Sequence, residues 1–351
     1  MSPDTRVSGR LRDQTRAARV TALLTRWEAV LIYLLIGVAI VFSTQSPYFL
    51  DGFNLLNTTL NFTERAIIAL PLIFVIIAGD IDISMAGIMA LSSLSMGMAA
   101  GQGAGVPGLI VIGLVVGLAA GILNGLIITF FDVPSIAVAI GSMSLYRGIA
   151  YGVLGDKAYT EYPLELSNLG QGFIPGTFVP IQLVIFVVLA GFFWFLLHYT
   201  RFGRETYAIG NGKTAAQFSG VNVPRHRLIN FAMTGLMSGL AAVLLTARIG
   251  STRPNIANGW ELQVVTTVVL GGVAITGGRG NVFGVIMGIF LLGYLKFGMG
   301  LVNVPGRVMD IVTGVLLIVA ILVPEMIGRF RKKRELAQTR AEIGGSPAGH
   351  N

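Results

Sequence analysis

Long apolar stretches recur along the chain and are separated by short polar segments. Their lengths are close to the roughly 17–25 residues that an α-helix needs to cross a bilayer. The pattern predicts about ten transmembrane helices, at residues 28–46, 64–79, 83–100, 106–131, 133–154, 180–199, 228–247, 262–275, 281–302 and 305–324. Two of them are expected to be short and broken, because Pro71 falls inside one and Gly271-Gly272 inside another. The sequence therefore predicts an all-α integral membrane protein.

Lysine and arginine concentrate between particular apolar stretches, and this sets the expected orientation. With a cytoplasmic N-terminus, the inside segments hold most of the 25 basic residues. Since cytoplasmic segments of membrane proteins are enriched in Lys and Arg, both termini are predicted to be cytoplasmic. The expected domain organisation is a basic tail at 1–27, a membrane domain at 28–325 with a large cytoplasmic loop at 200–227, and a basic, disordered tail at 326–351.

Composition narrows the class further. The 351 residues are 54% hydrophobic and 12% charged, whereas soluble domains carry about 25% charged residues. The net charge of +8 does not indicate nucleic-acid binding, because the basic residues serve as a topology signal and can face membrane lipid. The chain has no cysteine, which excludes disulfides, and its three histidines lie too far apart to form a metal motif.

A short helix is expected within the loop at 200–227. Asn211 can cap it at its start, Gly220 can end it, and the segment "GKTAAQFS" between them gives about two helical turns. So short a helix is unstable alone in water, so something must pack against it. From these residues, the loop either lies on anionic lipid through its flanking basic residues or docks on a soluble partner.

A glycine-rich segment at 268–288 raises the question of a nucleotide site. It lacks the Lys-Ser/Thr that follows the glycines of a phosphate loop, and it also fails the dinucleotide pattern. We expect instead a membrane helix that breaks and restarts, with the glycines forming the turn: Gly271, Gly272, Gly277, Gly278 and Gly280. The chain itself therefore has no nucleotide site that we recognise, and no bound cofactor is expected.

Two acidic residues interrupt the apolar sequence in "GDIDIS" at 79–84. Asp82 or Ser84 can cap the helix that follows, and an acid at a helix N-terminus is favoured by the helix dipole. Asp80 and Asp82 can equally form a polar gate, because ionisable residues inside a membrane often mark a pathway.

Further polar residues lie within or beside the apolar stretches. Glu64 and Arg65 are expected to pair locally, and Lys296 to extend toward the membrane surface. Aromatic and amide side chains near the expected outer face suit either a sugar or the interfacial aromatic belt. The residues that we consider for a solute path are Asn57, Asn61, Asn124 and Arg147.

Three stretches together resemble the permease subunit of a bacterial sugar-importing ABC transporter, of the ribose, xylose, rhamnose and autoinducer-2 branch. They are "GDIDIS" at 79–84, the loop at 203–223, and the glycine-rich "VVLGG" to "GGRG" stretch at 269–284. The resemblance covers about residues 45–325. One departure is Asp80, which stands where many relatives have glycine and looks more like the rhamnose and autoinducer-2 side of the branch.

The resemblance implies a transporter subunit rather than an enzyme, located in the bacterial inner membrane. ATP and Mg²⁺ would bind separate cytoplasmic ATPase subunits, a periplasmic or extracellular binding protein would deliver the sugar, and a second copy or a sister permease would complete the path. The implied coupling loop contains Gly203, Arg204, Gly210, Ala215, Ala216 and Gly220. Thr214 replaces the Glu found in many other importers.

Two other classes stay open at this point. A proton- or ion-coupled secondary carrier would use Asp80 and Asp82 as its ion site, since such carriers also contain broken helices. An integral-membrane enzyme would bind a metal there, although no His or further acid lies near these residues in the sequence.

Overall fold

The computed structural model describes residues 27–316, 318, 319 and 322. Most of this part is helical, and its extended pairings are two isolated bridges, Tyr159 with Thr252 and Phe173 with Pro180. The elements are α2 (Trp27–Gln45), α3 (Gly52–Thr58), η1 (Thr59–Asn61), α4 (Thr63–Ile77), α5 (Met85–Ala100), α6 (Val106–Phe130), α7 (Ser135–Leu154), α8 (Leu166–Gln171), α9 (Ile181–Tyr199), α10 (Arg201–Asn211), α11 (Lys213–Phe218), α12 (Val223–Ile249), α13 (Trp260–Leu270) and α14 (Val282–Leu301). Residues 306–316 are also helical.

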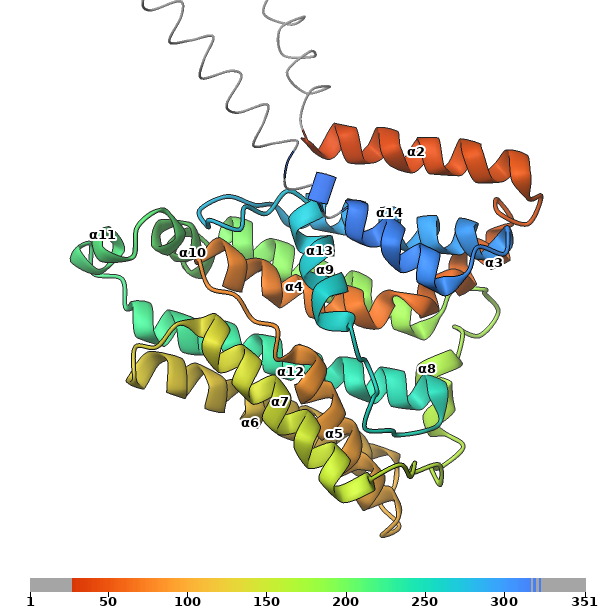
Figure 1. Ribbon diagram of the computed structural model, residues 1–351, viewed down its shortest axis with the longest axis horizontal. Helices are drawn as coiled ribbons and strands as arrows, with labels where there is room; N and C mark the ends of the chain where they lie inside the picture. Colours follow the sequence, from red (N-terminus) through yellow and green to blue (C-terminus); the bar gives the residue numbers. More distant parts are fainter. Residues whose placement is uncertain (1–26, 317, 320–321, 323–351) are drawn as a thin grey trace, which may run out of the picture.

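Helices α4 and α12 form the centre of the bundle. Every residue of α4 except Arg65 is buried, and it packs against α12, α9 and α13. In Figure 1, α2 and α14 lie above this centre and α6 and α7 below it. The buried positions of α6 and α7 recur every three or four residues, so each helix turns one face inward and exposes apolar side chains on the other. Such an outer face suits lipid.

Close backbone packing joins α6 to α12. Gly117 and Gly121 of α6 lie against Gly235 and Gly239 of α12, and a Cβ added at Gly121 would overlap the carbonyl of Phe231. Small residues allow membrane helices to approach in this way, where van der Waals packing replaces the hydrophobic driving force.

We therefore expect Gly121→Ala to destabilise the protein by about 1–3 kcal/mol, because the added methyl group overpacks a backbone contact. Thermal unfolding of the purified protein in detergent measures the change. The control is Gly148→Ala on α7, where an added Cβ meets nothing within 4 Å. Equal melting temperatures for the two variants would contradict the close packing.

Each predicted span falls on a helix of the structure, as far as that span is described. By length and composition six of these helices can cross a membrane, or seven if α3–η1 and α4, which meet at a bend of 60°, make one span. Helices α5 and α13 are shorter and apolar. The all-α membrane fold is confirmed, while the count of ten and the cytoplasmic termini stay predictions. The predicted tails at 1–27 and 326–351 lie outside the described residues, apart from Trp27 at the start of α2.

The two expected breaks have different outcomes. The break at Gly271-Gly272 is confirmed, because α13 ends at Leu270 and α14 begins only at Val282. The break at Pro71 is wrong, because α4 continues through it. Proline removes one N–H from the helical ladder, and neighbouring helices can cover the exposed carbonyl. The chain instead bends before α4, at Phe62.

Candidate functional site

The three motifs that suggested an importer meet at one end of the bundle, the left-hand end in Figure 1. The backbone N–H of Gly278 donates to the carbonyl of Ile77 over 2.8 Å, which joins the glycine-rich loop to the end of α4. A Cβ added at Gly210 of α10 would overlap both Ile77 and Gly278. The hydroxyl of Tyr207 also donates to the carbonyl of Gly280 over 2.7 Å. Segments distant in sequence thus form one backbone junction.

Helix α11 projects from this junction with one face anchored and one face free. Ala216 is buried against Ala78, Ile209 and Val223, whereas the side chain of Phe218 is 89% exposed. Gly220, with φ +84°, ends the segment as predicted. The helix therefore buries one small residue, Ala216, against the bundle and presents the aromatic ring of Phe218 outward.

The predicted cap at Asn211 is wrong. Asn211 is the last residue of α10, and its side chain donates to the carbonyl of Tyr207 over 2.8 Å. Gly212 occupies the capping position of α11. A polar residue next to a glycine can end one helix as readily as start another, and here Asn211 ends α10.

Asp80 forms a buried ion cluster beside α11. Both of its carboxylate oxygens accept from the guanidinium of Arg227 on α12, each at 2.8 Å, and Lys213 at the start of α11 lies 3.4 Å away. The side chains of Asp80 and Arg227 are only 4% and 8% exposed. Asp132 lies 3.7 Å from Arg227. The cluster connects the ends of α4, α11 and α12.

Asp82 belongs to a separate hydrogen-bonded chain. Its Oδ1 accepts from the backbone N–H and the hydroxyl of Ser84 at 2.9 and 2.6 Å. Asn124 donates to the Ser84 hydroxyl, and Tyr146 donates to Asn124. Ser84 holds the capping position of α5 without a side-chain capping bond, so Asp82 is the residue that satisfies an N–H at this helix start.

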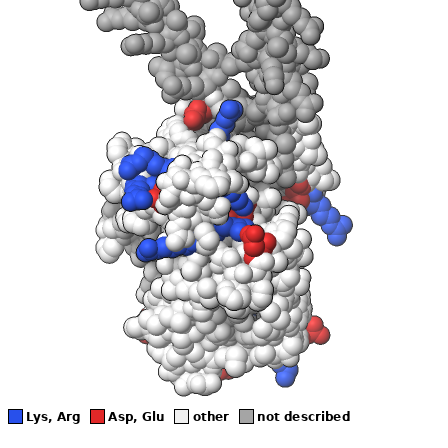
Figure 2. Space-filling model, turned by 90° about the vertical axis from the view of Figure 1, so that its left-hand side faces the viewer, with Lys and Arg blue, Asp and Glu red and all other residues white. Residues whose placement is uncertain are grey.

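The outward surface at this end is basic. Arg201, Arg204, Lys213, Arg225 and Arg279 are exposed there. Figure 2 views this end directly and shows Lys and Arg side chains gathered over part of it. A basic surface at this end of the bundle, beyond the apolar membrane-facing helices, is consistent with the prediction that this end is cytoplasmic.

Polar contacts also close the opposite end of the bundle. Glu64 pairs with Arg248 of α12 at 2.6 Å, and Arg65 donates to the side chain of Gln263 and the carbonyl of Asn61. The predicted local pair of Glu64 with Arg65 is wrong, because adjacent residues on a helix point in different directions. Lys296 lies 3.5 Å from Asp310.

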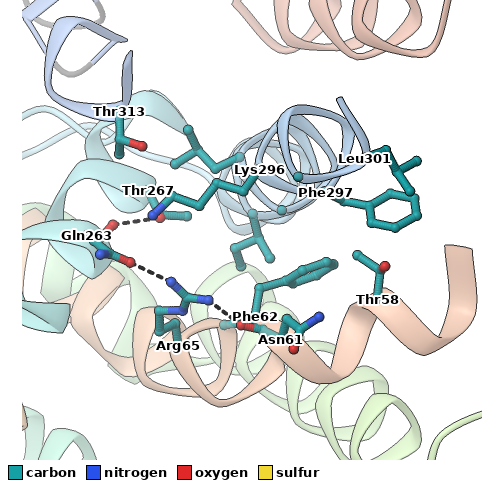
Figure 3. Close-up of a pocket in the computed structure, with 15 residues that line it drawn as sticks. Thr58, Asn61, Phe62, Arg65, Gln263, Thr267, Lys296, Phe297, Leu301 and Thr313 are labelled. Carbon is teal, nitrogen blue, oxygen red and sulfur yellow. Dashed lines mark hydrogen bonds between the residues drawn. The ribbon is translucent and has the colours of Figure 1, made fainter. Parts of the chain in front are cut away.

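A cavity of about 370 Å³ lies at this second end, between α4, α13 and α14. Arg65, Gln263 and Lys296 point into it (Figure 3). From the sequence, Arg65 and Lys296 stood out only as charged residues in separate apolar stretches. Their proximity to each other could be seen only in the fold.

The four residues considered for a solute path do not come together. Asn61 lines the cavity, and Asn57 lies on the neighbouring helix α3 without lining it. Asn124 lies in the Asp82 chain, and Arg147 donates to the carbonyls of Pro254 and Ile256. No cluster of metal-binding side chains occurs in the part of the chain that the structure describes.

Comparison with known proteins identifies the class. The family model of the branched-chain amino acid transport system permease component matches residues 54–321. The ribose import permease protein of Bacillus subtilis (strain 168) is 34% identical over 287 residues, covering 81% of this chain and 88% of the relative. The autoinducer 2 import system permease protein of Escherichia coli O9:H4 (strain HS) is 33% identical over 302 residues, covering 84% and 91%.

No solved structure matches the chain significantly. The resemblance to importer permeases is nevertheless confirmed by relatives that cover most of the membrane domain, and their similarity favours an importer subunit over an ion-coupled carrier. The chain belongs to the family of branched-chain amino acid transport system permease components, and it is a multi-pass permease of the bacterial inner membrane.

Proposed function

We propose that the chain forms the solute path of an ATP-driven, binding-protein-dependent importer, and that α11 is its docking element for a cytoplasmic ATPase subunit. The observation that carries this proposal is the exposed ring of Phe218 on a helix anchored by Ala216. Burial of this large apolar side chain by a partner would be favourable, because it removes apolar surface from water. Aromatic anchors of this kind carry much of the binding energy of protein interfaces.

The contacts around α11 give a route for coupling. Lys213 and Arg227 connect α11 and α12 to Asp80 after α4. Gly210, Ile77 and Gly278 connect α10 to α4 and to the loop before α14. A displacement of α11 would therefore be transmitted to several membrane helices at once. Nucleotide would shift the equilibrium between the inward-facing and outward-facing states, because its affinity differs between the two states. In this proposal the coupling residues are Gly203, Arg204, Gly210, Ala215, Ala216 and Gly220.

The chain contributes no catalysis in this function. ATP and Mg²⁺ are bound by the partner ATPase subunits, an extracytoplasmic binding protein delivers the solute to the end opposite α11, and a second permease copy or sister subunit completes the path. The solute is a monosaccharide or a related small hydroxylated compound, because the curated relatives import ribose and autoinducer 2. The basic tails at 1–27 and 326–351 and the loop at 200–227 face the cytoplasm and its lipid surface.

Uptake by proteoliposomes tests this function. The permease, its ATPase and its binding protein are reconstituted together, and accumulation of the radiolabelled solute that the binding protein retains is measured. Uptake is expected to require ATP at the α11 side and to be unaffected by an uncoupler. The control is the permease without ATPase, and its accumulation of solute on a proton gradient would establish the carrier instead.

A further inference from the structure

The cavity between α4, α13 and α14 is large enough for a ligand. Its volume of about 370 Å³ falls within the range of about 300–1,000 Å³ typical of small-molecule sites. Polar side chains line one side, and Phe62 and Phe297 contribute apolar surface. Figure 3 shows Arg65, Gln263 and Lys296 on that polar side.

The charge of this lining is unbalanced. Arg65 and Lys296 are basic, and no acidic residue is among the 15 that line the cavity. Of the acids nearby, Glu64 pairs with Arg248 and Asp310 with Lys296. Arg65 bonds two neutral oxygens and lies against the ring of Trp260, at 4.9 Å from its centroid. Its Nε is buried and has no hydrogen-bond partner among the described residues.

A guanidinium without a carboxylate partner is costly in a membrane protein, and a counter-charge relieves that cost. Arginine presents a planar fork of donors that matches a carboxylate with two parallel hydrogen bonds. Three basic residues here, Arg65, Arg248 and Lys296, stand against two acids, Glu64 and Asp310. A neutral sugar would leave this excess of positive charge, whereas a sugar with one acidic group would neutralise it and still offer hydroxyls to Asn61, Gln263 and Thr267.

We infer that this cavity is a binding station for a monoanionic hydroxylated solute of the sugar-acid class, with its carboxylate held by Arg65 and Lys296. This inference rests on the proposed function, because it assigns a solute to the path of an importer. The site lies at the end of the bundle opposite α11, where the proposal places solute entry.

Fluorescence of Trp260 offers a direct binding assay, because its ring touches the Arg65 guanidinium. The permease in phosphatidylcholine nanodiscs is titrated with matched acid and neutral probes: glucuronate with glucose, galacturonate with galactose, and ribonate with ribose. We expect a saturable response to at least one acid, at least about tenfold tighter than its neutral partner, because a charged hydrogen bond is worth about 1.5–3 kcal/mol. Acids that bind no better than their neutral partners would overturn the inference.

Variants locate the response. Arg65→Gln is expected to weaken acid binding at least about tenfold by the same reasoning, and Lys296→Met to weaken it as well. Arg253→Gln, an exposed residue that does not line the cavity, is the matched control. Trp260→Phe should abolish the signal. Unchanged affinity in Lys296→Met, or a signal that survives Trp260→Phe, places binding elsewhere and overturns the inference, even if Arg65→Gln fails to fold.

Two further titrations distinguish a sugar acid from other anions that could bind at this cavity. Inorganic phosphate that competes as well as the sugar acids would indicate a general anion site, and a response to phosphatidylglycerol in place of the acids would indicate a lipid headgroup; either overturns the inference. The assay contains no ATPase, so failure here leaves the ATP-dependent uptake of the proposed function untouched. Failure of that uptake likewise leaves acid binding intact.

Discussion

Replacing Phe218 with aspartate is expected to abolish association with the ATPase subunits while leaving the permease folded in the membrane. The ring is 89% exposed, so the bundle itself loses almost no packing. At an interface, truncation of a central aromatic anchor commonly costs about 2 kcal/mol or more, which corresponds to at least about 30-fold weaker binding. A buried charge in its place adds a desolvation cost. Co-purification from detergent and the ATPase activity of the complex measure the loss.

Phe218→Leu is the matched control, because it keeps an apolar side chain at the same position and is expected to retain most of the binding. A melting temperature equal to that of the wild-type permease would show that the aspartate variant is folded. An aspartate variant that co-purifies with a full complement of ATPase would exclude α11 as the docking element.

Removing Arg227 is expected to have the largest effect on stability. Arg227→Met leaves the Asp80 carboxylate buried with only Lys213 nearby, and Lys213 is 43% exposed. Breaking a buried ion pair from one side costs about 3–5 kcal/mol, because the remaining charge stays desolvated. Thermal unfolding in detergent is expected to show a large decrease in melting temperature, together with loss of ATP-dependent uptake.

Two comparisons make this result specific. The double variant Asp80→Leu/Arg227→Met removes both charges and is expected to recover much of the stability, since apolar groups often replace a buried ion pair without loss. Arg201→Met breaks the exposed pair with Glu205, in which Arg201 is 80% exposed, and is expected to change stability by under about 1 kcal/mol. Equal destabilisation by Arg227→Met and Arg201→Met would contradict a structural role for the buried cluster.

The membrane fold was predictable because each helix carries its own signal. The apolar runs, the turn at Gly271-Gly272 and the end of α11 at Gly220 are all local properties of the chain. Pro71 shows where a local rule fails, since burial on all sides of α4 keeps the helix continuous. Asn211 shows the same for capping, because it was expected to begin α11 and instead is the last residue of α10.

The candidate sites were less predictable because their parts come from distant segments. Asp80 and Arg227 are 147 positions apart, and Glu64 and Arg248 are 184 apart. A sequence shows that each of these charges needs a partner, but several partners of suitable charge exist and only tertiary packing selects among them. Asn124 and Arg147 illustrate the converse: their polarity suggested a path, and the structure uses them in hydrogen bonds to other parts of the bundle.

The burial of α4 bears on how the transport cycle can be observed. This helix leads from the cavity at Arg65 to the junction at Ile77, yet it offers almost no surface to which a spin label or fluorophore could be attached without disturbing its neighbours. Its displacement is better followed by pairs of labels on exposed positions at the two ends, such as Ser219 after α11 and Leu164 before α8. The change in that separation between nucleotide states would report relative motion of the two ends of the bundle that α4 connects.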